Sequence, residues 1–97
     1  MKTVKQVFEF EWDIGNLGKN KKHGVEAQES EEAFLDDGRV IYRDAVHSEN
    51  EERFILLGKT EKGRLLYVVF IYRRKKIRII SARDINKKEV QLYEETT

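Results

Sequence analysis

"ERFILLGKTEKGRLLYVVFIYRRKKIRIISAR", residues 52–83, is rich in branched apolar and aromatic residues and predicts three consecutive strands. Charged turns at 60–63 and 73–75 separate these strands. The residues from Leu65 to Phe70 are apolar at odd and even positions alike, which is typical of a central strand covered on both faces. Because strands joined by such short turns run antiparallel, the segment predicts a mainly antiparallel sheet.

Two shorter strands are predicted before this segment. "VFEFEWD", residues 7–13, alternates aromatic residues with acids, which is the period of a strand with one solvated face. We place this strand at about 7–12 and expect Trp12 to anchor it against the helices. "RVIYRDA", residues 39–45, predicts the other short strand.

Two helices are predicted between these short strands. Asp13 can cap a short helix through Lys22, which two internal glycines weaken and Gly24 stops. Many good helix formers then predict a second helix at about 26–36, ended by Gly38.

A third helix is predicted at the end of the sequence. "NKKE", residues 86–89, fits a capping box that opens a helix through Glu95. Tyr93 on this helix is expected to be a core aromatic with its hydroxyl at the rim. The order of strand, two helices, four strands and helix predicts one α+β domain spanning 1–97, with helices packed on a mainly antiparallel sheet.

The composition excludes several classes of function. The 97 residues include no cysteine, so a disulfide, a thiolate nucleophile and a cysteine-based zinc site are all excluded. The longest apolar run, from Leu65 to Ile71, is far too short to cross a bilayer. Glu9, Glu11 and Asp13 would span about 13 Å on a strand, which is too wide for one ion. We therefore expect a cytoplasmic protein with no metal, no cofactor and no membrane partner.

Charge is segregated along the chain, although the formal net charge is only +1. Residues 73–88 hold eight basic residues against one acid, whereas residues 26–37 hold six acids and no basic residue. This asymmetry indicates one surface for a polyanion and another for a basic partner. The alternative is that both clusters are solvated charges at opposite ends of the molecule.

A set of short motifs resembles a known family. "FEWD", "KN", "KKHGV", "SEEAF", "EERFILLGKT", "GRLL", "IRIISARDINKKE" and "YEE" occur in the order found in the BrnT toxins, from about Phe8 to Glu95. This resemblance implies a small ribonuclease of the RelE-like fold that cleaves RNA, inhibits translation and arrests growth. It also implies neutralisation by a DNA-binding, BrnA-like antitoxin, and binding of the two proteins together to their own promoter DNA.

Two arginines on the last predicted strand are candidates for contact with RNA. Cleavage of RNA without a metal needs a base for the 2′-hydroxyl, cations for the charge on the phosphorane, and a proton donor for the leaving oxygen. Arg83, at the strand exit, can bind a phosphate with its planar fork, or can form a structural ion pair with Glu89. Arg78 lies five residues earlier, which in a regular strand places it on the opposite face, where it contacts RNA or pairs with an acid.

The remaining candidates also have two interpretations each. Arg64 can reach a phosphate from a strand entrance, or is an ordinary turn arginine. Glu52 and Arg53 adjoin on one strand and so face opposite ways; Glu52 is a catalytic base or a member of a cross-strand salt bridge. His23 is a proton-transfer residue or a helix cap. The catalytic candidates are therefore Arg83, Arg64, His23 and Glu52, and the RNA-binding candidates are Lys22, Arg53, Lys76 and Arg78.

Two other functions remain open at this point. A non-catalytic nucleic-acid-binding module would have the same basic segment without needing Arg83 individually. A protein-interaction domain would instead bind through its apolar strand edges and its acidic helix.

Overall fold

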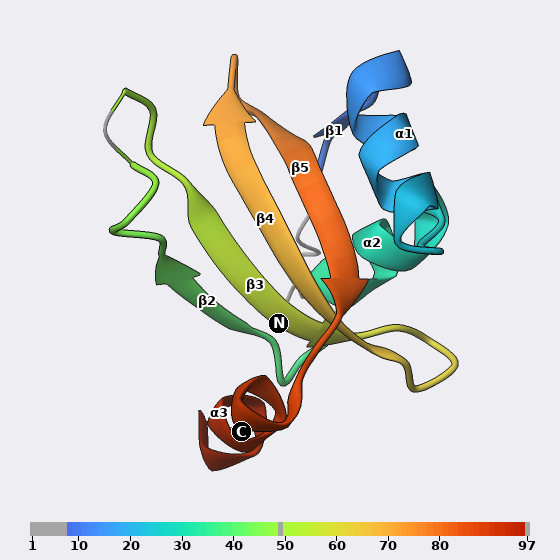
Figure 1. Ribbon diagram of the computed structural model, residues 1–97, viewed down its shortest axis with the longest axis vertical. Coiled ribbons are helices and arrows are strands. Elements are labelled where there is room, and N and C mark those ends of the chain that lie inside the picture. The colour runs from blue at the N-terminus through green and yellow to red at the C-terminus, as the bar shows by residue number, and fades with distance from the viewer. Residues whose placement is uncertain (1–7, 49, 97) are drawn as a thin grey trace, which may run out of the picture.

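The computed structural model describes residues 8–48 and 50–96. Within these residues the chain forms a five-stranded sheet, in the order β1-β5-β4-β3-β2, and three helices (Figure 1). The elements in chain order are β1 (Phe10–Glu11), α1 (Ile14–Lys22), α2 (Ala27–Phe34), β2 (Val40–Arg43), β3 (Phe54–Lys59), β4 (Leu65–Arg73), β5 (Lys76–Asp84) and α3 (Lys87–Thr96). This order confirms the predicted α+β class.

The sheet is mixed. The pairs β2–β3, β3–β4 and β4–β5 are antiparallel, as predicted, but β1 pairs with β5 in parallel, with Phe10 opposite Ile77 and Glu11 opposite Arg78. Short turns force neighbouring strands to run antiparallel, whereas β1 and β5 are joined through the whole rest of the sheet. The direction of β1 was therefore not determined by any turn signal.

The first strand is shorter than predicted. Only Phe10 and Glu11 pair with the sheet, and residue 7 of the predicted range lies outside the described residues. Phe8, Phe10 and Trp12 nevertheless pack against the core, and the Trp12 indole N–H donates a hydrogen bond to Glu31 of α2 at 2.7 Å. The expected anchoring of Trp12 against a helix is confirmed.

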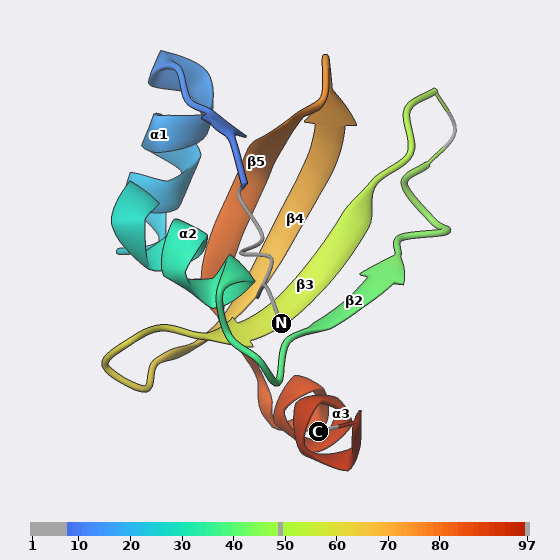
Figure 2. The same ribbon diagram turned by 180° about the vertical axis from the view of Figure 1, so that it is seen from behind.

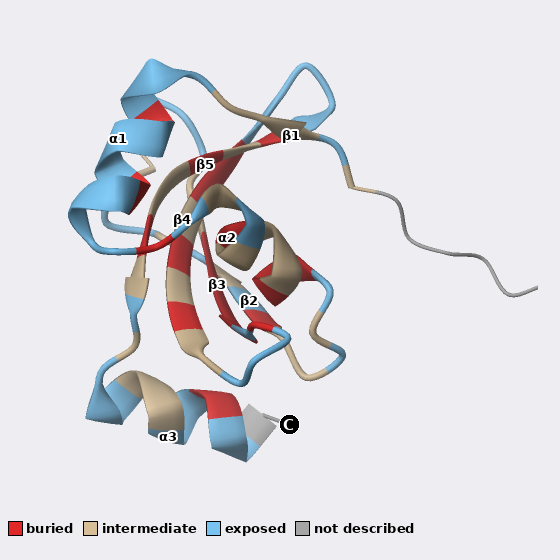
Figure 3. Ribbon diagram, turned by 90° about the vertical axis from the view of Figure 1, so that its right-hand side faces the viewer, coloured by how far each residue is buried: buried red, intermediate tan, exposed pale blue. Residues whose placement is uncertain are grey.

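The main core lies between the sheet and α2, which Figure 2 shows lying across β3 and β4. Phe34 of α2 packs edge-on against Phe70 of β4, with ring centroids 4.9 Å apart. Figure 3 shows the buried residues concentrated on α2 and on the strands that face it. The fully or nearly buried apolar residues of this cluster are Val25, Ala33, Phe34, Leu56, Leu66, Val68, Phe70, Ile77, Ile79 and Ala82.

The opposite face of the sheet is covered only in part. Tyr93 of α3 is buried there with Val40, Ile55 and Leu57, and its hydroxyl donates to Asp36 at 2.6 Å, which confirms the predicted core aromatic with a rim hydroxyl. Further along this face, Tyr67 and Val69 of β4 are only half-buried. The prediction that this strand is covered on both faces is therefore confirmed for the α2 face and only in part for the other, because α3 lies at one end of the strands (Figure 1).

A β-bulge in β5 changes which side chains share a face. Phe70 pairs with Ile79 and Val69 pairs with Ser81, so Ile80 is an extra residue in β5. Arg78, opposite Ile71, and Arg83, opposite Tyr67, therefore both point away from the α2 side. The prediction that these two arginines lie on opposite faces was wrong, because it assumed a regular strand.

Gly58 of β3 allows α2 to pack directly on the sheet. A Cβ at residue 58 would lie 2.4 Å from the Ala33 carbonyl oxygen, whereas a Cβ at Gly18 of α1 would meet no atom within 4 Å. Gly58→Ala should therefore lower the free energy of unfolding by about 1–3 kcal/mol through overpacking. Gly18→Ala should instead raise it by about 0.5–1 kcal/mol, because glycine is entropically unfavourable in a helix. Urea titrations of both variants test this, and equal effects of the two substitutions would contradict it.

Candidate functional site

The predicted site residues separate into two groups at opposite ends of β5. Arg64 and Arg83 lie where β4 begins and β5 ends, and Arg64 donates to the Gly24 carbonyl at 3.0 Å, which places Lys22 and His23 at the same end. The group at the other end consists of Glu52, Arg53, Lys76 and Arg78. Nine residues of strand extend about 26 Å, so one phosphodiester cannot contact both groups.

Arg83 is held in one orientation by three neighbours. Its Nη1 and Nη2 donate to the two carboxylate oxygens of Glu89 at 2.9 and 2.8 Å, and Nη1 also donates to the Asp84 carbonyl at 3.0 Å. The guanidinium carbon lies 3.8 Å from the centre of the Tyr67 ring. The ion pair with Glu89 that the sequence suggested is therefore present, and 37% of the Arg83 side chain remains exposed.

Glu89 connects this arginine to the start of α3. Its carboxylate accepts from the Asn86 N–H and its own N–H donates to the Asn86 side chain, both at 2.9 Å, which confirms the predicted capping box. Partial burial opposes ionisation of Glu89, but the hydrogen bonds from Arg83 and Asn86 outweigh it and lower the pKa of the carboxyl. The ionised carboxylate fixes both the helix start and the arginine.

Two tyrosines that sequence reasoning did not select lie near Arg83. Tyr67 is its direct cross-strand partner, and Tyr42 of β2 packs with Tyr67 against the small core around Tyr93. Burial raises the pKa of both phenols, so they remain protonated hydrogen-bond donors at neutral pH. We call the half-buried group Tyr42, Tyr67, Val69 and Arg83 the open face. In the sequence, the only indication of this face was Tyr67, a tyrosine at an alternating position of an otherwise apolar strand.

Arg64 connects four segments of the chain. Its Nε and Nη2 donate to Asp84 at 2.6 and 3.1 Å, and its Nη1 donates to both oxygens of Glu29 at 3.2 Å, in addition to Gly24. The hydrogen bonds that Arg64 donates to Asp84 and Glu29 raise the pKa of Arg64, and the bond from Arg64 lowers the pKa of Asp84. A phosphate at Arg64 would have to compete with two carboxylates.

His23 and Lys22 lie at the C-terminal end of α1. His23 is the C-cap residue and Lys22 is the last helical residue, and both are exposed. His23 directly precedes Gly24, whose carbonyl accepts a hydrogen bond from Arg64. The backbone of His23 therefore lies next to the Arg64–Asp84 pair. His23 therefore caps the helix through its backbone, as one of the two interpretations proposed, and its imidazole is left accessible to a ligand.

In the other group, Arg78 and Glu52 form ion pairs. Arg78 pairs with Asp13 at 2.7 Å and with Glu11 at 3.2 Å, and only 14% of its side chain is exposed. Glu52 pairs with Arg43 at 3.2 Å, as the salt-bridge interpretation proposed, with both side chains at least half exposed. Glu52 and Arg53 do not lie in a strand, because β3 begins at Phe54.

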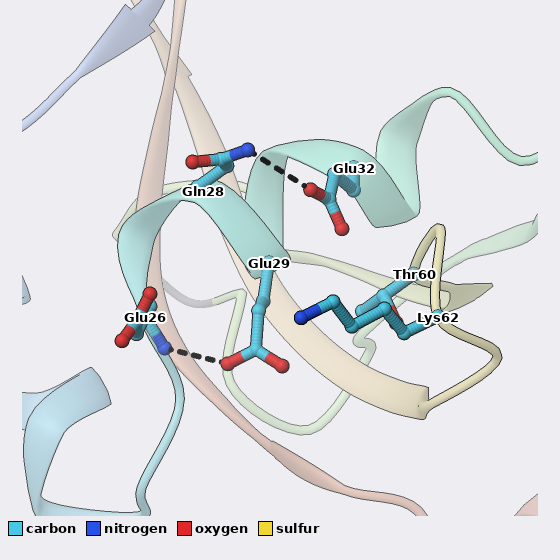
Figure 4. Close-up of a pocket in the computed structure, with 6 residues that line it drawn as sticks. All are labelled: Glu26, Gln28, Glu29, Glu32, Thr60 and Lys62. Carbon is cyan, nitrogen blue, oxygen red and sulfur yellow. Dashed lines mark hydrogen bonds between the residues drawn. The ribbon is translucent and has the colours of Figure 1, made fainter.

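The acidic segment forms a shallow pocket of about 290 Å³ between α2 and the β3–β4 turn (Figure 4). It is lined by Glu26, Gln28, Glu29, Glu32, Thr60 and Lys62. In residues 8–48 and 50–96, no three histidines or acids are grouped to hold a metal ion. No helix in the described part of the chain is long and apolar enough to cross a membrane.

The fold defines a small α+β protein whose candidate basic residues lie at the two ends of β5, an arrangement suited to a polyanionic ligand. A family model described as "Ribonuclease toxin, BrnT, of type II toxin-antitoxin system" matches residues 12–89. The chain belongs to this BrnT family of ribonuclease toxins, and membership implies an RNA substrate and an antitoxin partner. A search of curated proteins found no match.

The hydrogen bonds of Arg64 predict that its replacement destabilises the protein more than replacement of Arg43 does. Arg64→Ala should lower the free energy of unfolding by about 1–3 kcal/mol, because it leaves Asp84 and Glu29 without their partner. Arg43→Ala, which removes an exposed pair, should cost at most about 0.5 kcal/mol. Urea titration at pH 7 measures both values, and an equal cost would contradict this role for Arg64.

The same variant should change the pH dependence of stability. The hydrogen bond from Arg64 lowers the pKa of Asp84 in the folded protein, so the contribution of this pair is present above the ordinary value of 3.8 and is lost as pH falls through the lowered pKa. Arg64→Ala should therefore lose less stability than the wild type between pH 5 and about pH 3.

Proposed function

We propose that this chain is a metal-independent endoribonuclease that cleaves RNA at Arg83, by attack of a 2′-hydroxyl on the neighbouring phosphate. The observation that carries this proposal is the fixed orientation of Arg83. Its Nη1 and Nη2 donate hydrogen bonds to Glu89, and the plane of its guanidinium stacks on the Tyr67 ring. Among the described residues, the hydrogen bonds of Arg83 use Nη1 and Nη2, so we propose that its Nε–H binds the incoming phosphate.

The roles follow from what the reaction requires. Arg83 neutralises the charge that develops on the phosphorane oxygens. His23 is the base that we favour for the 2′-hydroxyl, because it lies at the same end of the sheet as Arg83, whereas Glu52 lies at the other end. The protonated phenols of Tyr42 and Tyr67, which share the open face with Arg83, supply hydrogen-bond donors.

Family membership supports the cellular part of the proposal. We propose that the protein acts in the cytoplasm, inhibits translation and growth by cutting RNA, and is neutralised by a BrnA-like antitoxin with which it binds promoter DNA. The α+β sheet with α2 across one face supports a RelE-like fold.

Replacement of Arg83 tests the proposed site. Arg83→Ala should lower kcat/KM for RNA cleavage by about 10²–10³-fold, which is typical for loss of one transition-state donor. Arg83→Lys should recover only part of this loss, because an ammonium group cannot bind phosphate with two parallel bonds. Arg43→Ala is the matched control, since it also removes an arginine from a carboxylate pair. Full activity of a folded Arg83→Ala variant would refute the site.

The mechanism predicts how cleavage depends on metal and on the sugar. Cleavage should persist in EDTA and should produce a 2′,3′-cyclic or 3′-phosphate and a 5′-hydroxyl, because the nucleophile belongs to the substrate. A strand with 2′-deoxyribose at the scissile nucleotide should resist cleavage. Mass analysis of the products checks both points, and cleavage of the deoxy strand at an equal rate would mean that water is the nucleophile.

A further inference from the structure

The turn between β4 and β5 adopts a conformation that disfavours its own residues. Arg73 pairs with Lys76, so Arg74 and Lys75 form a two-residue loop, with φ angles of 53° and 66°. Positive φ at both loop positions defines a type I′ turn, for which Asn-Gly is the preferred sequence. Side chains with a Cβ are strained in this left-handed region. The turn therefore contains two long basic side chains, Arg74 and Lys75, at positions where Asn and Gly would form the same turn with less strain.

The charges at this turn are not balanced by the rest of the described chain. Residues 73–76 are four consecutive basic residues, all exposed. Arg73 lies 3.5 Å from Glu11, but in residues 8–48 and 50–96 no ion pair involves Arg74, Lys75 or Lys76. Both the backbone conformation and the mutual repulsion of these cations oppose folding, so the fold itself does not account for them.

An exposed aromatic ring adjoins the turn. Tyr72 is 57% exposed, and its ring meets Phe54 and Phe70 edge-on, with centroids 5.5 and 5.6 Å away. These contacts support the ring on the sheet while more than half of the residue faces solvent. An aromatic platform beside unpaired cations is the combination that binds single-stranded nucleic acid, through base stacking and phosphate contacts.

We propose that this hairpin tip, formed by Tyr72, Arg74, Lys75 and Lys76, is a binding subsite for single-stranded RNA, remote from the cleavage site. Tyr72 stacks on one unpaired base, and Arg74 and Lys75 contact the flanking phosphates. The choice of RNA rests on the proposed function, and the choice of a single strand rests on Tyr72, because a base must be unstacked to cover the ring.

The position of the tip sets the length of RNA that it can use. Lys76 and Arg83 are seven residues apart on β5, which corresponds to about 23 Å. A stacked strand advances about 3.4 Å per nucleotide, and Tyr72 lies on the α2 face whereas Arg83 points away from it, so at least about seven nucleotides separate the subsite from Arg83. The hairpin tip therefore distinguishes long single-stranded RNA from short fragments.

The test uses the full chain and a fluorescent 12-nucleotide 2′-O-methyl RNA, which lacks the attacking hydroxyl. Replacing the loop with the preferred turn sequence, Arg74→Asn with Lys75→Gly, should raise Tm by about 4–8 °C, because it removes backbone strain. The same variant should weaken Kd about tenfold and reduce the slope of log Kd against log salt by about 1.4, since two phosphate contacts are lost. Tyr72→Leu should weaken Kd about tenfold without changing the salt slope, because stacking releases no counterion.

The matched control removes two charges elsewhere. Lys59→Gln with Lys62→Gln, beside the acidic pocket, should leave Kd within about twofold. The subsite would be overturned if the loop variant kept its Kd or had a lower Tm. It would also be overturned if the control variant lost as much affinity as the loop variant, or if the protein bound duplex DNA of equal length more tightly. Since binding is measured on an uncleavable strand, failure to cleave RNA would overturn the proposed reaction and leave this result standing.

Discussion

Burial of one face of β5 imposes the geometry on which the rest of the molecule depends. Ile77, Ile79 and Ala82 all lie in the core beneath α2, although residues 79 and 82 cannot share a face of a regular strand. The extra residue Ile80 reconciles the spacing with the burial, so the hydrophobic core requires the bulge. As a consequence, Arg78 and Arg83 both leave the core on the side that α2 does not cover.

The molecule contains two kinds of cation, and they suit different tasks. Arg64, Arg78 and Arg83 are each held by carboxylates, so their orientation is fixed before any ligand binds. The cations at the hairpin tip are exposed and almost unpaired within the described chain, so their field extends into solvent. In a ribonuclease of the BrnT family, oriented arginine suits the reacting phosphate, and unpaired charge suits the capture of a long polyanion.

Several features of the site could be predicted because the interacting residues are close in the chain. Arg83 and Glu89 are six residues apart across a capping box, so their pairing followed from the start of α3. Arg64 is different, because its partners Asp84 and Glu29 are 20 and 35 residues away. The stacking of Tyr67 on Arg83 was also not predictable, since it depends on the register of β4 against β5.

The sequence by itself determined the helices, the antiparallel hairpins and the family, because caps, turns and motifs are local and act within a few residues. Only the tertiary structure decided the parallel pairing of β1, the bulge at Ile80 and the face shared by Arg78 and Arg83. These features depend on which distant surfaces are buried together, and burial is a property of the packed chain, which no local pattern encodes.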